Sequence, residues 1–375
     1  MRIGLTGGGT GGHFYPIVAV VEEIQKISEE ERLVLPQYTY YADTPYNERL
    51  LFENRITYTH IPAGKWRRYF SVRNYLDIFK TLAGIVKATG TLFKTYPDVI
   101  FSKGGYASFP AVFVARLLRI PLIIHESDST PGRVNRWAAK YATRIAVSYP
   151  DAFSFFPEGK TAVTGNPIRA SIQHPVKVGA HEFLDLDPNL ATILILGGSQ
   201  GSQKINDILL DILPDLLTRY QVIHQVGRKN LHEVKERANY LLTDNNLSKR
   251  YKLFDYLNDS ALRMAAGVAT LVISRAGSSI FEIAQWGVPS IIIPIPETVS
   301  HDQVTNAFTY ARFGGAIVME ENNLTAHVLS SEINRLLGNS VLLTKMAEGA
   351  KSFARPDAAR AIARELIQIC LSHEQ

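Results

Sequence analysis

Short apolar runs alternate with glycine-rich turns and amphipathic segments along the whole chain. Four times an apolar run is followed by glycines and then by apolar residues at three-to-four spacing, twice in each half of the sequence. The runs cover residues 2–6, 99–102, 192–196 and 271–274, and a further strand is predicted over 288–293. Alternating strands and helices of this kind predict parallel sheets with right-handed crossovers. The expected fold class is therefore α/β, with two Rossmann-like domains whose parallel sheets face each other across a cleft.

The domain boundary is expected within residues 165–188, which contain three prolines and little periodicity. We therefore expect an N-terminal domain over 1–165 and a C-terminal domain over 166–355. The final segment, 356–375, predicts a helix with one apolar face. This helix can pack on either domain, including back onto the N-terminal one.

Residues 73–94 form the most informative amphipathic segment. Apolar side chains cover about half of its circumference, and basic residues seven positions apart follow one edge of that half: Arg73, Lys80, Lys87 and Lys94. One interpretation is a core helix with a solvated basic edge. The other is an interfacial helix whose apolar residues enter the lipid boundary while the basic row meets anionic headgroups. Aromatic and basic residues interleaved over 65–70 favour the second interpretation.

Composition narrows the class of protein. Of the 375 residues, 46% are hydrophobic and 20% charged, as in ordinary folded proteins. The single cysteine, Cys370, excludes internal disulfides and Cys-rich metal sites. We find no secretory signal and no run of the roughly 20 apolar residues that span a bilayer. The expected protein is soluble and cytoplasmic, and able to contact a membrane.

Positive charge is concentrated in one region. Residues 65–103 contain eight basic and two acidic residues, whereas the whole chain carries a net charge of only +5. A single basic patch indicates a partner surface. The expected partner is an anionic membrane surface bound through 65–94, and no nucleic acid is expected.

The first glycine loop, residues 7–12, precedes His13. Its glycines let a phosphate or sugar approach backbone N–H groups at a helix N-terminus. The loop lacks the Gly-Lys-Ser/Thr ending of a P-loop and the acidic partner of a dinucleotide fingerprint. One such loop is a weak signal, but four in two domains are far more specific.

Several polar residues near these loops have both a structural and a functional interpretation. His13 either bonds to the backbone at a helix start or acts as a base at neutral pH. Glu282 is either a favourable charge near a helix N-terminus or an acceptor for the hydroxyls of a ribose. Ser199 and Arg169 are either an ordinary cap and surface charge or donors to a diphosphate.

Together these features resemble the MurG family, the peptidoglycan N-acetylglucosaminyltransferases that convert lipid I to lipid II. The resemblance covers nearly the whole chain. Its motifs are the 7–13 loop, Ser102-Lys103-Gly104-Gly105-Tyr106, His125-Glu126, Pro131-Gly132 with Asn135-Arg136, Gly165-Asn166-Pro167-Ile168-Arg169, Gly197-Gly198-Ser199-Gln200-Gly201, Ser274-Arg275-Ala276-Gly277 leading to Glu282, and Asp302-Gln303 before Asn306-Ala307.

The resemblance implies an inverting glycosyltransferase of the two-Rossmann GT-B architecture. Its donor would be UDP-N-acetylglucosamine (UDP-GlcNAc), bound mainly by 166–355. Its acceptor would be lipid I, undecaprenyl-diphosphoryl-N-acetylmuramoyl-pentapeptide, bound by 1–165 at the cytoplasmic face of the bacterial membrane. Neither a divalent metal nor a cofactor is implied, because loops, helix dipoles and Arg169 would stabilise the leaving UDP.

Site residues carry over by position. The resemblance implies catalytic roles for His13 and Glu126, and an acceptor or diphosphate loop of Gly104, Gly105 and Tyr106. The implied donor contacts are Thr10, Gly11, Gly12, Asp128, Arg169, Ser199, Leu257 through its backbone, Gly277, Ser278, Ser279, Ile280, Phe281, Glu282 and Gln303.

Two segments depart from the family pattern. Many members have His-Glu-Gln-Asn where this chain has His125-Glu126-Ser127-Asp128. The usual Tyr-Ile-Gly after the second strand is replaced by Tyr41-Ala42-Asp43.

Three alternatives remain open at this point. The first is a GT-B transferase with another lipid acceptor, such as a diacylglycerol glycosyltransferase. The second is a UDP-GlcNAc epimerase, which shares the two-domain shape and would act without a lipid acceptor. The third is a non-catalytic nucleotide-binding module.

Overall fold

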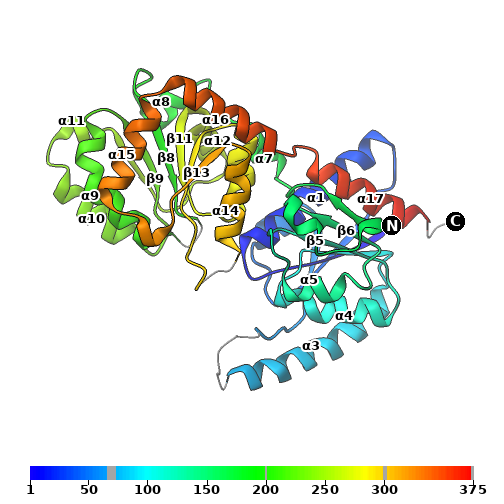
Figure 1. The fold of residues 1–375 in the computed structure, drawn as a ribbon. Coiled ribbons are helices and arrows are strands. Elements are labelled where there is room, and N and C mark those ends of the chain that lie inside the picture. Colours follow the sequence, from blue (N-terminus) through cyan, green and yellow to red (C-terminus); the bar gives the residue numbers. More distant parts are fainter. Residues whose placement is uncertain (66–72, 199–200, 299–301, 373–375) are drawn as a thin grey trace. The chain divides into compact units, whose positions relative to one another are not determined.

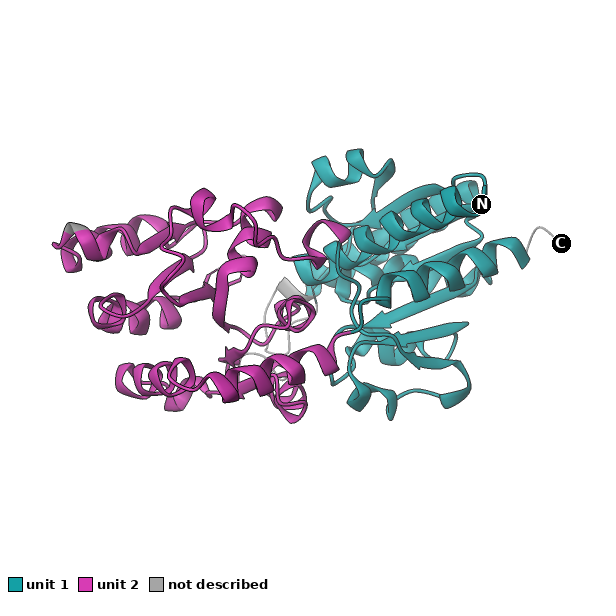
Figure 2. Cartoon of the chain, turned by 90° about the horizontal axis from the view of Figure 1, so that it is seen from above, with its two compact units in different colours: residues 1–169, 355–375 teal, residues 170–354 magenta. Residues whose placement is uncertain are grey.

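The computed structural model describes residues 1–65, 73–198, 201–298 and 302–372. The chain forms two compact units, which Figure 2 shows in teal and magenta. Unit 1 consists of Met1–Arg169 and Arg355–Gln375, and unit 2 of Ala170–Ala354. The sequence placed the boundary after residue 165, and the observed division follows Arg169.

Unit 1 contains a seven-stranded parallel sheet in the described part of the chain, in the order β3-β2-β1-β4-β5-β6-β7. Its strands are β1 (Arg2–Thr6), β2 (Gln37–Ala42), β3 (Ile56–His60), β4 (Val99–Ser102), β5 (Leu122–Glu126), β6 (Arg144–Val147) and β7 (Thr161–Val163). The strand order reverses between β1 and β4. Their register places Thr6 opposite Ser102, so the loops that follow these two strands start side by side.

Helices cover the sheet of unit 1 (Figure 1). They are α1 (Gly11–Glu30), α2 (Glu48–Glu53), α3 (Arg73–Thr95), α4 (Phe109–Leu117), α5 (Arg133–Ala138), α6 (Pro150–Phe153) and α17 (Ala358–Ser372), with short 3-10 turns η1 (Tyr106–Ser108) and η2 (Glu158–Lys160). The final helix, α17, shares one core cluster with α1, in which Ile362 and Leu366 are buried together with Ile17 and Val21. The sequence left its domain open, and the structure places it in unit 1.

Unit 2 contains a six-stranded parallel sheet among the described residues, in the order β10-β9-β8-β11-β12-β13. Its strands are β8 (Thr192–Leu196), β9 (Gln221–Gln225), β10 (Tyr251–Phe254), β11 (Ala269–Ser274), β12 (Ser290–Ile292) and β13 (Ala316–Val318). This is the 3-2-1-4-5-6 order of a Rossmann sheet, and it reverses between β8 and β11.

The helices of unit 2 enclose a second core, formed mainly by apolar residues of its strands and of the helix after β8. They are α7 (Ala170–Gln173), α8 (Ala180–Leu184), α9 (Gln203–Leu217), α10 (Leu231–Leu241), α11 (Asn245–Ser248), α12 (Asp259–Val268), α13 (Ser279–Trp286), α14 (Gln303–Arg312), α15 (Ala326–Leu337) and α16 (Ser340–Phe353), with the turn η3 (Glu321–Asn323).

The structure confirms the predicted α/β class with two parallel-sheet domains. One strand differs, since the strand predicted over 288–293 covers only Ser290–Ile292. Pro289 and Pro294 flank it, and a proline lacks the N–H that a sheet ladder needs. In the described part of the chain, no helix combines the length and apolarity that a bilayer span requires.

Candidate active site

The four glycine loops lie at the carboxyl ends of the strands where each sheet reverses its order. Loops 7–12 and 103–105 follow the neighbouring strands β1 and β4 in unit 1. In unit 2, the described residues 197–198 and 201–202 and the loop 275–278 follow the neighbouring strands β8 and β11. Open α/β sheets bind ligands at such switch points. The local fold therefore provides one candidate binding edge in each unit.

The first loop has a backbone that requires glycine at two positions. Gly9 has φ 93°, and a Cβ on it would lie 3.2 Å from the ring of Tyr106. On Gly7 a Cβ would lie 2.9 Å from the side chain of Lys103. Thr10 precedes α1 in an extended conformation, and its side chain does not cap the helix. N–H groups in the first turn of α1 are therefore left for an anionic ligand.

His13 is held in one tautomer by the same loop. Its Nδ1 lies 3.1 Å from the carbonyl oxygen of Gly8 and 3.3 Å from Oγ1 of Thr10. A carbonyl only accepts, so Nδ1 carries the hydrogen and Nε2 carries the lone pair. Burial and the charge of Lys103 lower the pKa of His13, outweighing the charge of Asp128 and the bond to Gly8. His13 is therefore a neutral imidazole at neutral pH, with Nε2 as its basic atom.

The second loop packs on the first. Gly105 has φ 77°, and a Cβ on it would lie 3.4 Å from Cε1 of His13. Gly104 has φ 74°, and a Cβ there would lie 2.6 Å from Nδ2 of Asn135. Gly104 has no room for a side chain, and the positive φ of Gly105 favours glycine there. The Gly104-Gly105 turn therefore lies beside the His13 imidazole, with Tyr106 next to Gly9.

Lys103, which directly follows β4, is buried and has an exposed fraction of only 1%. Its Nζ lies 2.5 Å from Nδ1 of His125, 2.6 Å from Oγ of Ser127 and 3.1 Å from Oδ1 of Asn166. Burial lowers the pKa of Lys103 to about 7, although the charges of Glu126 and Asp128 oppose this shift. The sequence marked Lys103 only as part of a motif and a basic region, and gave no sign that it is buried.

His125 connects Lys103 to the segment that leaves unit 1. Its Nε2 lies 3.0 Å from the carbonyl oxygen of Gly165, so Nε2 donates and Nδ1 accepts from Lys103. Burial and the charge of Lys103 hold the pKa of His125 well below its ordinary value. His125 is therefore neutral and acts as a link between Lys103 and Gly165.

Glu126 is buried at the end of β5 and binds its own chain. Its Oε1 accepts from the N–H of Asp128 at 3.1 Å, and its Oε2 accepts from the N–H of Gly132 at 3.0 Å and from Nδ2 of Asn135 at 2.9 Å. Burial and the charge of Asp128 raise the pKa of Glu126 to about 7. With both oxygens bonded within the chain, Glu126 orders the 127–132 loop, and the catalytic role that the family resemblance implies for it stays a prediction.

The 165–169 segment is anchored at three points within unit 1. Gly165 has φ 83° and bonds to His125, and a Cβ on it would lie 2.4 Å from Cβ of Arg355. Asn166 bonds to Lys103, and Arg169 is buried with its guanidinium 4.3 Å from the ring centroid of Tyr15. These contacts explain why the motif begins with glycine and place Arg169 beside α1.

In unit 2, the loop after β8 is supported by an arginine that the sequence analysis did not single out. The hydroxyl of Ser202 caps α9 by accepting from the N–H of Ile205 at 3.4 Å. Nη2 of Arg275 donates to that hydroxyl at 2.6 Å, and Arg275 also pairs with Glu321. Ser199 itself lies outside the described residues.

The remaining predicted donor contacts of unit 2 are available mainly through their backbone. The N–H of Leu257 donates to Oε1 of Gln225 at 3.0 Å, and the Leu257 side chain is buried. Ile280 and Phe281 also bury their side chains, so only their backbone can meet a ligand.

Two predicted donor contacts of unit 2, Glu282 and Gln303, are polar residues near the start of a helix. Glu282 lies half-buried in the first turn of α13, which follows Gly277, Ser278 and Ser279. Gln303 begins α14, and its Oε1 accepts from the N–H of Ile295 at 3.1 Å.

Helix α3 presents apolar side chains to solvent. Phe79, Val86 and Phe93 are 69%, 74% and 72% exposed, and Tyr75, Leu76, Ile78 and Leu82 are exposed as well. The buried side of this helix consists of other residues, among them Ala88 and Leu92. Most of the apolar half predicted from the sequence therefore faces solvent, and only its members Ile85 and Leu92 pack on the core. The core-helix interpretation does not hold for the exposed members.

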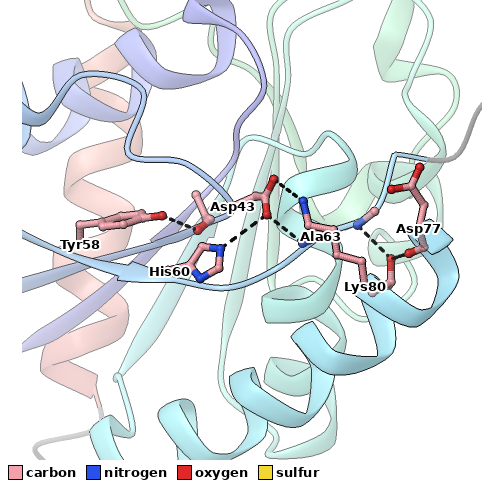
Figure 3. A network of polar contacts seen from close by, with 9 residues as sticks. Asp43, Tyr58, His60, Ala63, Asp77 and Lys80 are labelled. Carbon is pink, nitrogen blue, oxygen red and sulfur yellow. Dashed lines mark hydrogen bonds and ion pairs between the residues drawn. The ribbon is translucent and has the colours of Figure 1, made fainter. Parts of the chain in front are cut away.

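One member of the predicted basic row is paired within the chain (Figure 3). Nζ of Lys80 lies 2.8 Å from Oδ2 of Asp43, which follows β2, and Nε2 of His60 lies 3.7 Å from the other oxygen of Asp43. Lys87 and Lys94 are exposed on the same helix, and the Arg73 side chain lies outside the described residues. Lys80 therefore anchors α3 to unit 1, a contact that the helical spacing alone did not predict.

Among the described residues, no group of three or more His, Cys, Asp or Glu side chains is placed to hold a metal ion.

Comparisons with known proteins agree over most of the chain. Models of the glycosyltransferase family 28 N-terminal and C-terminal domains match residues 3–147 and 192–362. A curated relative from Clostridium botulinum (strain 657 / Type Ba4) is 35% identical over 94% of this chain and 97% of its own. It is named UDP-N-acetylglucosamine--N-acetylmuramyl-(pentapeptide) pyrophosphoryl-undecaprenol N-acetylglucosamine transferase. A relative of the same name from Clostridium novyi (strain NT) is 33% identical over 89% and 90%. The crystal structure of Acinetobacter baumannii MurG covers 98% of this chain and 99% of its own, with 25% identity and a TM-score of 0.72.

The chain belongs to the MurG family of glycosyltransferases. The predicted enzyme class is thereby confirmed. A UDP-GlcNAc 2-epimerase from Neisseria meningitidis bound to UDP-GlcNAc covers 98% of this chain and 100% of its own with a TM-score of 0.68, but at 15% identity it shares the fold alone.

Proposed function

We propose that this chain transfers N-acetylglucosamine from UDP-GlcNAc to the 4-hydroxyl of the N-acetylmuramoyl group of lipid I, forming lipid II. The observation that carries the proposal is the end-to-end similarity to relatives named for this transfer. The glycine loops at both sheet switch points support it, because such loops suit a diphosphate and a sugar.

We assign the donor mainly to unit 2. The first turn of α13, with Gly277, Ser278 and Ser279 before Ile280 and Phe281, offers N–H groups to an anion. The Leu257 carbonyl is the backbone group left for the uracil, since its N–H already binds Gln225. Glu282 accepts from the ribose hydroxyls, Gln303 contacts the donor from α14, and Ser199 is a further donor contact.

We assign the acceptor and the chemical step to unit 1. The 4-hydroxyl oxygen attacks the anomeric carbon from the side opposite UDP, the bond from that carbon to the UDP oxygen breaks, and the hydroxyl proton passes to Nε2 of His13. A neutral imidazole with Nδ1 fixed on Gly8 suits this role. Gly104, Gly105 and Tyr106 would hold the acceptor diphosphate, and Glu126 positions the loop that carries Asp128.

Departure of UDP places negative charge on the diphosphate. Thr10, Gly11 and Gly12 begin α1, whose N-terminal N–H groups stabilise such charge, and Arg169 supplies a cation next to this helix. Neither a metal nor a cofactor enters this proposal.

We further propose that α3 docks unit 1 on the anionic cytoplasmic surface of the bacterial membrane, where the lipid acceptor is located. Its exposed aromatic and aliphatic side chains suit the interfacial region, and Lys87 and Lys94 suit anionic headgroups.

A transfer assay tests the proposal. The full chain is incubated with labelled UDP-GlcNAc, with and without lipid I in vesicles, and the lipid and nucleotide products are separated. Label in a glycolipid, together with free UDP, is expected only when lipid I is present. Labelled UDP-N-acetylmannosamine formed without lipid would instead identify an epimerase, and label in diacylglycerol would identify another lipid acceptor.

A further inference from the structure

Lys103 is a buried amine beside the groups assigned to the chemical step, and it carries a positive charge below its pKa of about 7. It follows β4, which lies between β1 and β5, the strands that lead to His13 and to Glu126. Neither the family match nor the proposed roles give it a task. An unpaired buried charge is costly, so the contacts of this ammonium need an explanation.

The three N–H groups of Lys103 match three acceptors on separate parts of the chain. Nδ1 of His125 is the acceptor from β5, Oγ of Ser127 is the acceptor from the loop after β5, and Oδ1 of Asn166 is the acceptor from the 165–169 segment. An ammonium supplies three N–H donors, whereas a methionine side chain of similar length supplies none. Lys103 therefore ties the 127–132 loop to the 165–169 segment through hydrogen bonds as well as through charge.

Lys103 and Asp128 exert opposite electrostatic effects on His13. The charge of Lys103 lowers the pKa of His13, and the charge of Asp128 raises it. His125 also interacts electrostatically with His13 and is neutral, while Glu126 acts on Lys103. Asp128 is the residue that departs from the uncharged Asn of the family pattern, so this chain has placed an additional negative charge near its candidate base.

We propose that Lys103 is a positioning residue for the transfer reaction, which holds the Ser127-Asp128 turn in place and balances the charge of Asp128 so that His13 stays neutral. The inference rests on the proposed role of His13 as the base. Without the cation, Asp128 stabilises a protonated His13, which has no lone pair left to accept the proton of the acceptor hydroxyl.

The test compares Lys103→Met, Asp128→Asn and the double variant, all as full chains, by kcat against pH with UDP-GlcNAc and lipid I. In each profile, kcat falls at low pH as His13 becomes protonated, and we call this fall the acid limb. We expect the acid limb of Lys103→Met to lie at higher pH than that of the parent. Below the limb, kcat should drop about tenfold for each pH unit by which the limb has moved. The KM for UDP-GlcNAc should change by less than about twofold, because the loss concerns proton transfer and not donor binding.

The companion variants have opposite expectations. The acid limb of Asp128→Asn should lie at lower pH than the parent's, and the double variant should return close to the parental limb because both charges are absent. Lys140→Met, at an exposed lysine of unit 1, is the matched control and should retain the parental profile.

The inference is overturned if the Lys103→Met profile keeps the parental shape at a lower amplitude, or if the double variant does not recover the parental limb. Should Lys103→Met fail to fold in a thermal melt, Asp128→Asn alone still decides, since an unmoved limb there contradicts the balance of charges.

A second readout separates this inference from the proposed function. Titration of the His13 imidazole by NMR needs no substrate, and its midpoint should lie at higher pH in Lys103→Met than in the parent. A parent without transferase activity but with this shift refutes the proposed function and supports the charge balance. An unshifted midpoint refutes the charge balance whatever the activity.

Discussion

The exposed apolar side of α3 allows a quantitative prediction for membrane binding. We consider the triple replacement of Phe79, Val86 and Phe93 by Ser. These side chains are 69%, 74% and 72% exposed, so the variant removes little packing within unit 1 and should melt close to the parent. Transfer of a Phe or Val side chain out of water is worth about 1.5–3 kcal/mol, so the exposed parts of all three are worth roughly 3–6 kcal/mol.

An interfacial helix buries its apolar face only in part, so we expect a loss of about a third of that value, roughly 1–2 kcal/mol. This loss corresponds to about a tenfold weaker partition onto vesicles. The assay is sedimentation of the full chain with phosphatidylglycerol-containing vesicles over a range of lipid concentrations.

The matched control removes apolar side chains that are even more exposed but lie elsewhere. Phe52, Val178 and Tyr240 are 86%, 91% and 85% exposed, and their joint replacement by Ser should leave vesicle binding unchanged. Lys87→Gln should weaken binding at low salt more than Lys80→Gln, because Lys80 is paired with Asp43. Equal vesicle binding by the parent and the α3 triple variant would refute the assignment of this surface.

Three further predictions concern the site and the stability of unit 2. His13→Ala should lower kcat by at least about a hundredfold while UDP affinity and melting temperature hold, and near-parental kcat would restrict His13 to a structural role. Glu282→Ala should weaken UDP binding in calorimetry by about 1.5–3 kcal/mol, and unchanged affinity would exclude it from the ribose. Burial lowers the pKa of His224 from 6.5 to about 3, so the folded state binds fewer protons than the unfolded state between these values. The free energy of unfolding should therefore fall by about 1.4 kcal/mol for each pH unit between about pH 6 and about pH 4, and His224→Gln should remove this slope in chemical denaturation.

Much of the fold could be predicted because the strands of a buried parallel sheet consist of continuous runs of apolar residues. β1, β4 and β8 match the predicted strands, since their residues are almost entirely buried and glycine loops mark where they end. The apolar stripe of the final helix predicted its buried side, but the docking of α17 on α1 depends on tertiary contacts that no local pattern contains.

The sequence predicted the loops of the candidate site but not the hydrogen bonds between their side chains. Glycine density located the 7–12 and 103–105 loops, and the order of the motifs indicated the family. The spacing of residues did not reveal that Glu126 turns its carboxylate toward its own loop, or that Lys103 is buried between His125, Ser127 and Asn166. These orientations follow from strand adjacency, which brings together residues far apart in the sequence.

Heptad spacing likewise grouped Lys80 with the basic residues predicted to meet anionic headgroups. Its partner Asp43 follows β2 and lies 37 residues earlier in the chain. Such long-range pairing depends on where β2 and α3 meet in unit 1, so the sequence pattern counted one cation too many on the exposed edge of the helix.

The most direct test of the account is the structure of the product. The full chain is supplied with lipid I and UDP-GlcNAc carrying ¹³C in the sugar, and the glycolipid is analysed by mass spectrometry and NMR. The account predicts one added N-acetylglucosamine, joined to the 4-oxygen of the muramoyl sugar with inverted, β configuration. A product with retained configuration, another attachment site, or no sugar on lipid I would contradict it.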